Sequence, residues 1–423
     1  MPETGLRRSL GPAAGTAMAV GAVLGPGVLV LPALTVRTAG PAALVAWGSM
    51  AVFSLALAVA LGRAGARLPQ ADGIVAYARA AFGPRTTALT GYWLLGSVPL
   101  AVPVIALVGA GYVTSYFGAD PRWTVALAGA QLFGSCALNT LGMSLSGRVQ
   151  LVLVALTAAV LTGVSLLATG RMRTENFQPF LPHGWTAVAT AGLLIFWSYI
   201  GFEMVVHLAE EFRNPQRDLP LSMGLASILL SVVYFLSALV TVGTGVAYRD
   251  AGLAPLSALA DEALGRAAGG TLAVFALCCS FVAVHSNIAG FSRLMYTQAR
   301  AGRLPAALGL LHPRRRTPAR ALAALAAAFA LVLAAVAVTG PGLEELVVWP
   351  SATFVAVYLV GTLAAAKLLP RGGLGMPAAV LAAAVCLLIL PFSWPALLYP
   401  AAIAVVGLWA TRRGTRGAHD SHG

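Results

Sequence analysis

Residues that could do chemistry within an apolar segment gather between Phe196 and Asp218, which read FWSYIGFEMVVHLAEEFRNPQRD. Glu203 and His207 are four residues apart, so a helix would place both side chains on one face. Ionisable side chains in such a segment normally face a cavity or a partner, because exposing a charge to hydrocarbon is costly. The pair is interpreted either as a proton-linked gate or contact to a bound molecule, or as a structural pair whose charges neutralise each other.

A third ionisable residue, His285, lies in the later apolar stretch CSFVAVHSNIAG. Histidine changes its charge near neutral pH, which allows a role in gating or proton coupling. A hydrogen bond that packs two helices together is the other interpretation. Glu203, His207 and His285 are therefore the candidate residues for coupling and gating.

The composition defines the elements that must position these side chains. Of 423 residues, 59% are hydrophobic and only 10% are charged, and the mean hydropathy is +0.84. Blocks long enough to span a membrane predict an all-α membrane protein with about twelve transmembrane helices, because the strands of a membrane barrel are about 10 residues long and alternate in polarity. The predicted spans are 13–36, 41–62, 87–116, 122–142, 149–169, 185–209, 219–247, 268–296, 318–339, 343–368, 374–391 and 394–411.

The formal net charge of +13 is explained by topology and not by a nucleic-acid partner. With the N-terminus inside and twelve spans, most of the 27 basic residues fall on the inner side, which is the positive-inside pattern. Both termini are thus expected in the cytoplasm, and the helices are expected to lie in the lipid bilayer. The basic residues predicted on the outer side are Arg37, Arg122, Arg171, Arg173, Arg249 and Arg266.

Two predicted spans contain helix-weakening residues near their middle. The first reads GAVLGPGVLVLP, with Pro26 between Gly25 and Gly27, and the sixth has Ser198 and Gly201 in SYIG. The first span opens spans one to five and the sixth opens spans six to ten. Interrupted spans at corresponding positions are typical of transporters built from an inverted repeat.

The chain is therefore predicted as one integral membrane domain over residues 1–423. Residues 13–169 would form the first repeat and 185–368 the second, with 374–411 as two added helices. Residues 1–12 and 412–423 would be cytoplasmic tails.

Interrupted helices expose backbone groups of both polarities. An N-terminal half-helix end offers free N–H groups that suit a carboxylate. Unwound carbonyl oxygens suit an ammonium group. A zwitterionic amino acid fits both, so the sequence predicts a small-molecule amino acid substrate.

Three motifs carry a resemblance to a known family. FWSYIGFEMVVHLAEEFRNPQRDLP resembles the sixth-span signature of the amino acid–polyamine–organocation (APC) superfamily, LGPGVLVLPA its first-span motif, and FSRLMYTQARAGRLP the end of its eighth span. The resemblance implies a LeuT-like 5+5 inverted repeat with broken helices 1 and 6. Pro26 departs from the family pattern and removes one amide, which leaves Gly27 and Val28 as the donors to a carboxylate. The predicted substrate-binding residues are Gly25, Gly27, Val28, Phe196, Ser198, Tyr199 and Gly201.

Within the superfamily, TGYWLLGSVPLAVP and FEMVVHLAEEFRNP most resemble the bacterial amino acid efflux branch, which exports methionine and branched-chain amino acids. The resemblance implies a secondary active exporter of methionine, leucine, isoleucine and valine in the bacterial inner membrane, an antiporter driven by a proton gradient. An importer or exchanger, including one for cationic amino acids or polyamines, is an alternative, and so is a membrane sensor or channel without turnover.

Neither enzymatic activity nor a cofactor is predicted. Walker, kinase and metal motifs are absent from the sequence, and sodium stays open as a coupling ion. The sequence does not predict the oligomeric state. The four cysteines lie in apolar blocks without metal-like spacing to histidine, so no metal site is predicted: Cys136, Cys278, Cys279 and Cys386.

Overall fold

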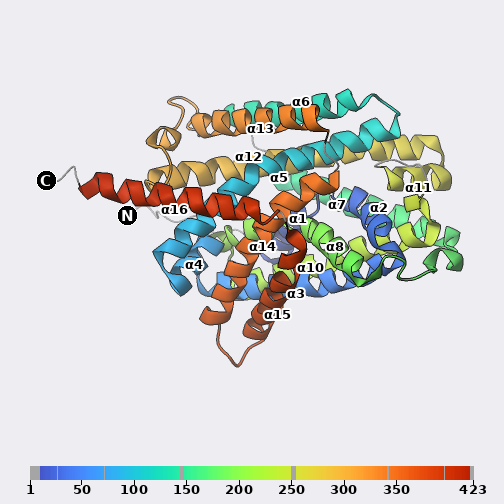
Figure 1. The fold of residues 1–423 in the computed structure, drawn as a ribbon, viewed down its shortest axis with the longest axis horizontal. Helices are drawn as coiled ribbons and strands as arrows, with labels where there is room; N and C mark the ends of the chain where they lie inside the picture. Colours follow the sequence, from blue (N-terminus) through green and yellow to red (C-terminus); the bar gives the residue numbers. More distant parts are fainter. Residues whose placement is uncertain are drawn as a thin grey trace.

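The computed structural model describes residues 10–25, 27–70, 72–142, 147–248, 254–340, 343–394 and 396–419. Over these residues the regular structure is helical, apart from one isolated bridge between Leu10 and Phe212 (Figure 1). The predicted all-α membrane fold is therefore confirmed.

Within the described residues, nine segments are long and apolar enough to cross a membrane. They are Gly27–Arg67, Pro84–Tyr116, Val152–Arg171, Gly184–Val206, Pro215–Thr244, Arg266–Arg300, Ala319–Thr339, Glu345–Leu368 and Gly375–Ser393. Two further apolar helical segments, Pro12–Val23 and Leu398–Leu408, are shorter. The chain is thus a multi-pass membrane protein, and a total of twelve spans stays a prediction.

The elements follow the predicted blocks closely. Two blocks consist of more than one helix: α1 (Pro12–Val23) with α2 (Gly27–Ala39), and α8 (Gly184–Phe196) with α9 (Phe202–Val206). The remaining long helices are α3 (Ala43–Arg67), α5 (Pro84–Tyr116), α6 (Pro121–Thr140), α7 (Gly147–Ala168), α10 (Pro215–Thr244), α12 (Arg266–Arg300), α13 (Ala319–Thr339), α14 (Leu343–Leu368), α15 (Gly375–Ile389) and α16 (Leu398–His419).

Two short helices connect long ones, namely α4 (Ile74–Phe82) and α11 (Pro255–Leu264). The helix α4 packs against α5 and α14, and α11 packs against α12. The helix α11 is not predicted from the sequence, because its ten residues are too few to show as a span.

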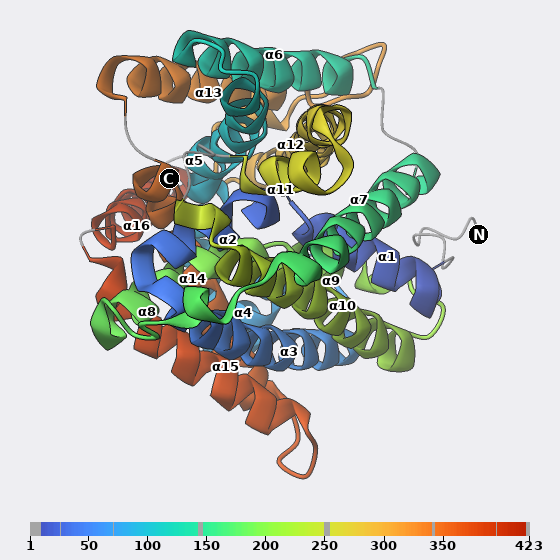
Figure 2. The same cartoon turned by 90° about the vertical axis from the view of Figure 1, so that its right-hand side faces the viewer.

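The interrupted helices pack against continuous ones. The helices α3 and α14 pack against α8, and α10 packs against α1 and α2. The helices α5 and α12 pack against each other, and α6 with α13 forms an outer layer (Figure 2). Aromatic side chains fill the centre: the ring of Phe196 lies 5.4 Å from that of Phe53 and 5.7 Å from that of Tyr358. The interruptions are therefore packed against continuous helices and aromatic side chains.

Candidate functional site

The first interruption separates α1 from α2. The helix α1 ends at Val23, and the amide of Gly25 donates to the carbonyl of Val23 at 2.8 Å in a tight turn. The helix α2 begins at Gly27. Pro26, which the sequence analysis places at this interruption, lies outside the described residues.

The second interruption follows a single 3-10 turn, Trp197–Tyr199, at the end of α8. Ile200 is extended, with φ −75° and ψ 135°, and Gly201 has a φ of 132° before α9 begins. Residues with a Cβ rarely adopt such a positive φ. Gly201 is therefore the residue that allows the chain to turn between the two helical pieces.

The two interruptions touch each other at Gly201. A Cβ on this residue would lie 2.8 Å from the carbonyl carbon of Ala22 and 3.2 Å from the Cα of Val23. The contact is with backbone, which cannot move aside as a flexible side chain can. A glycine is thus required here both by the turn and by the approach of α1.

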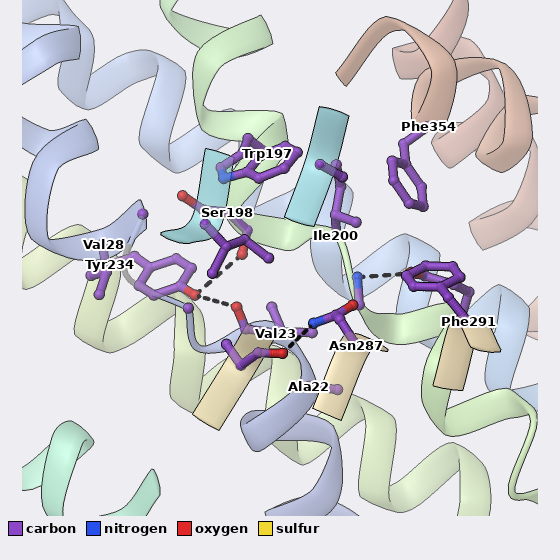
Figure 3. Close-up of a pocket in the computed structure, with 17 residues that line it drawn as sticks. Ala22, Val23, Val28, Trp197, Ser198, Ile200, Tyr234, Asn287, Phe291 and Phe354 are labelled. Carbon is purple, nitrogen blue, oxygen red and sulfur yellow. Dashed lines mark hydrogen bonds between the residues drawn. The ribbon is translucent and has the colours of Figure 1, made fainter. Parts of the chain in front are cut away.

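Tyr234 of α10 joins the same two segments. Its buried hydroxyl lies 3.2 Å from the carbonyl oxygen of Val23 and 3.2 Å from that of Ser198 (Figure 3). The hydroxyl has one proton, so it donates to one carbonyl at a time. Tyr234 thereby holds the end of α1 beside the end of α8.

A small cavity of about 50 Å³ opens where the interruptions meet. Helices α1, α2, α5, α9, α10, α12 and α14 contribute to it, together with the 3-10 turn Trp197–Tyr199. Its described lining is Ala22, Val23, Gly25, Gly27, Val28, Ala101, Ile105, Trp197, Ser198, Ile200, Gly201, Glu203, Tyr234, Ala283, Asn287, Phe291 and Phe354 (Figure 3).

Residues with polar backbone or side-chain groups line this cavity. The helix α2 begins at Gly27, and the first amides of a helix have no partner within it. Val23 and Ser198 also line the cavity, and their carbonyl oxygens lie within hydrogen-bond distance of the hydroxyl of Tyr234. The hydroxyl of Ser198 is buried, and it has no hydrogen-bond partner among the described residues. Buried hydroxyls are normally satisfied, so Ser198 marks a place where a ligand or water would bind.

Glu203 lies beside the cavity and is 2% exposed. One carboxylate oxygen accepts from the amide of Gly201 at 3.0 Å and from the hydroxyl of Tyr358 on α14. The same amide lies 3.2 Å from the hydroxyl oxygen of Tyr358. The carboxylate is therefore bonded to the turn that interrupts the sixth predicted span.

The structure brings together most of the residues predicted to bind substrate. Gly25, Gly27, Val28, Ser198 and Gly201 all line the cavity. Two predicted residues lie behind its wall instead. The ring of Phe196 packs against those of Phe53 and Tyr358, and Tyr199 packs against Tyr234 while its hydroxyl lies 3.2 Å from that of Ser231.

The two histidines lie apart from the cavity lining. A Cβ on Gly73, in the turn before α4, would lie 2.8 Å from Cε1 of His207, so this imidazole packs against that turn. The Nδ1 of His285 lies 3.1 Å from the hydroxyl of Ser135 and 3.2 Å from Nδ2 of Asn139, both on α6. His285 thus joins α12 to α6, in line with the packing interpretation.

A second pocket of about 290 Å³ adjoins the cavity and shares Ala22, Ala283 and Asn287 with it. It extends between α1, α9 and α12 toward Met18 and Arg293, and His285 lies in its wall. The two pockets are therefore neighbours along α1 and α12.

Two polar residues near the cavity, Tyr234 and Tyr358, are not singled out by the sequence patterns. Tyr234 and Tyr358 bond to the interruptions, and Asn287 lines both pockets. A signal existed, because a tyrosine in the middle of an apolar span needs a hydrogen-bond partner for its hydroxyl.

The comparisons with known proteins agree with this architecture. The crystal structure of a mutant of the Eremococcus coleocola manganese transporter superposes with a TM-score of 0.59 over 95% of this chain and 94% of that chain. The two sequences are only 14% identical, so the likeness shows the fold alone. The protein has the fold of a helical membrane transporter.

Sequence relatives define the family. Residues 10–412 match the family described as amino acid permease. The chain is 40% identical over 420 residues to the uncharacterized amino acid permease YecA of Bacillus subtilis (strain 168), covering 99% of this chain and 98% of that protein. It is 29% identical over 416 residues to the L-methionine/branched-chain amino acid exporter YjeH of Escherichia coli (strain K12), covering 96% of each. The chain belongs to the amino acid permease family of the APC superfamily, as the sequence motifs predict.

Proposed function

We propose that the protein is a secondary active transporter of neutral, apolar amino acids, an exporter of methionine, leucine, isoleucine and valine driven by a proton gradient. The observation that carries this proposal is the cavity at which the two interrupted helices meet. It combines free amides, carbonyl oxygens and an apolar wall in one place.

Recognition of the amino acid backbone follows from the interruptions. The first amides of α2, at Gly27 and Val28, bind the carboxylate, helped by the positive end of the helix dipole. Carbonyl oxygens at the ends of α1 and α8 accept from the ammonium group. The hydroxyl of Ser198 gains a partner when the substrate binds, which removes the cost of leaving it unsatisfied.

The side chain of the substrate contacts the apolar part of the wall, formed by Ile105, Ile200, Phe291 and Phe354. This wall suits methionine and the branched-chain amino acids. A cavity of about 50 Å³ holds only a few water molecules. Binding of leucine therefore requires these side chains to shift outward.

Coupling is assigned to Glu203. Its carboxylate bonds to the amide of Gly201 and to Tyr358, so gain or loss of a proton changes the bonds that fix the sixth-span turn. A carboxylate already held by these two donors is poorly placed to bind the cationic side chain of lysine or arginine. This favours a neutral substrate over the cationic alternative.

Direction and location rest on the relatives and on charge. A relative that aligns along nearly the full chain is named as an exporter of methionine and branched-chain amino acids. The positive-inside pattern supports a cytoplasmic location for both termini in a bacterial cell. The pocket that leads to Met18 and Arg293 is then the route between the cavity and the cytoplasm.

Flux in proteoliposomes tests the proposal. Radiolabelled methionine or leucine is offered with a pH gradient imposed in either sense. An exporter driven by protons accumulates substrate in the direction opposed to proton flow and in excess of the amount of protein. Uptake that stops at one substrate per protein would show a sensor, and a flux unaffected by either gradient would contradict proton coupling.

A further inference from the structure

A basic pocket lies at one end of the molecule and shares no lining residue with the central cavity. Its volume is about 350 Å³, and its wall includes Arg63 and Arg67 of α3 and Gln216 of α10. The two arginines are one helical turn apart and both are exposed. Among the described acidic side chains, none forms an ion pair with either guanidinium. The pocket therefore presents two uncompensated positive charges.

The loop between α14 and α15 holds Arg63 in place. A Cβ on Gly375 would lie 2.9 Å from Cδ of Arg63, and one on Gly373 would lie 3.7 Å from its Nη1. The arginine thus packs over the space that these glycines leave free. The aliphatic part of Arg63 is therefore in contact with this loop, while the residue as a whole stays exposed.

The pocket lies at the level of the lipid headgroups. It forms where α3 ends at Arg67, α10 begins at Pro215, α14 ends at Leu368 and α15 begins at Gly375. All four belong to segments that are long and apolar enough to cross the membrane. The ends of such segments meet the polar headgroup region on either side of the hydrocarbon.

An apolar groove of about 530 Å³ follows α3 and α10 into the hydrocarbon region. Its wall includes Val52 and Leu55 of α3 and Ile228, Val232 and Phe235 of α10. Figure 2 shows these two helices side by side, with α15 next to α3.

The pocket and the groove lie on one continuous face. Val52, Leu55, Val59 and Arg63 follow one another at helical spacing along the outward face of α3. Leu55 and Arg63 are about 12 Å apart along the axis, a distance that an acyl chain spans easily. On α10, Gly224 lies between the two regions, and a Cβ there would meet nothing within 4 Å. The surface of α10 at Gly224 is thus open.

We propose that the basic pocket and the apolar groove together bind one anionic phospholipid. The phosphate group lies between Arg63 and Arg67, and an acyl chain lies along the groove between α3 and α10. A soluble phosphate ion has the same charged group as the lipid headgroup, but it has no acyl chain that could occupy the groove. The positive-inside pattern places the site in the cytoplasmic leaflet, where basic clusters attract anionic lipids.

Lipid retention tests this proposal without any transport measurement. The purified full chain is incubated with equal amounts of phosphatidylglycerol and phosphatidylethanolamine in detergent, and the lipids that stay bound are quantified by mass spectrometry. We expect the protein to retain phosphatidylglycerol in preference to phosphatidylethanolamine. Each basic residue near an anionic headgroup raises affinity roughly fivefold, so R63Q/R67Q should lower the preference by roughly twenty-fivefold.

Two further variants complete the experiment. R314Q/R315Q removes the same charge from an exposed loop and should leave the preference unchanged. Gly224→Phe fills the groove and should lower retention of both lipids alike. An unchanged preference in R63Q/R67Q, or retention unaffected by Gly224→Phe, would overturn the proposal. Displacement of phosphatidylglycerol by millimolar inorganic phosphate would show a soluble-anion site and overturn it as well.

Discussion

Tyr358 donates a hydrogen bond to the carboxylate of Glu203, and both side chains are buried. The two residues come from different helices, α14 and α9, and the carboxylate also accepts from the amide of Gly201. A change in the charge of Glu203 therefore acts directly on the turn beside the cavity. This geometry is what a proton-linked switch in the sixth-span interruption requires.

Replacement of Glu203 separates coupling from binding. Glu203→Gln resembles the protonated carboxyl group and keeps an oxygen that accepts from Gly201 and Tyr358. We expect substrate binding and one-for-one exchange to persist in proteoliposomes, while transport driven by a pH gradient is lost. Accumulation against a substrate gradient with only a proton gradient supplied would assign Glu203 a structural role instead.

Gly201 should not tolerate a side chain. Gly201→Ala places a Cβ against the backbone of Ala22 at a φ of 132°, and an unfavourable positive φ alone costs roughly 1–3 kcal/mol. We expect loss of leucine binding and a lower Tm in detergent. Gly192→Ala is the matched control, because a Cβ there meets nothing within 4 Å and the residue lies within α8. Wild-type binding by Gly201→Ala would show that the contact with α1 is dispensable.

Ser198 should matter to the ligand more than to the fold. Its hydroxyl has no partner among the described residues, so Ser198→Ala removes no hydrogen bond from the protein. A hydrogen bond to the substrate is worth about 0.5–1.5 kcal/mol, so leucine affinity should fall roughly threefold to tenfold. The control is Ser237→Ala, whose hydroxyl lies 3.4 Å from that of Ser165, away from the cavity. Equal affinities in the two variants would remove Ser198 from the site.

Gly27 tests the carboxylate site. An added Cβ would lie 3.4 Å from side-chain atoms of Leu31 and Trp197 and 3.6 Å from Oγ of Ser198, which is ordinary contact. Gly27→Ala should therefore fold normally and bind more weakly. The branched side chain of Gly27→Val would fill the space in front of the free amides and abolish leucine binding. Unchanged affinity in purified Gly27→Val would contradict carboxylate binding at α2.

Part of this structure could be predicted from sequence because it depends on local chemistry. Glycines lower helix propensity wherever they occur, so the weak points near Gly25 and Gly201 can be read from the chain. The long helices can also be predicted, because the apolar composition of each block is a local property of the chain. By contrast, Tyr234 and Tyr358 reach the interruptions from other helices, and one-dimensional periodicity does not show which helices are neighbours.

The histidines illustrate the same difference. Spacing alone puts His207 on the face of Glu203, but the imidazole packs against the turn at Gly73. Sequence left His285 with two interpretations, and its contacts with Ser135 and Asn139 of α6 give it a partner that lies far away in the chain. The roles of Glu203, His207 and His285 in coupling stay predictions until the variants are measured.

Competition against radiolabelled leucine binding to the purified protein tests the central claim most directly. The account requires an ammonium group, a carboxylate and an apolar side chain together. Methionine, isoleucine and valine should therefore displace leucine. Lysine and arginine should not, nor should isopentylamine, which lacks the carboxylate, or 4-methylpentanoate, which lacks the amine. Displacement of leucine by arginine would contradict this mode of binding. Displacement by isopentylamine or 4-methylpentanoate as complete as that by unlabelled leucine would contradict it as well.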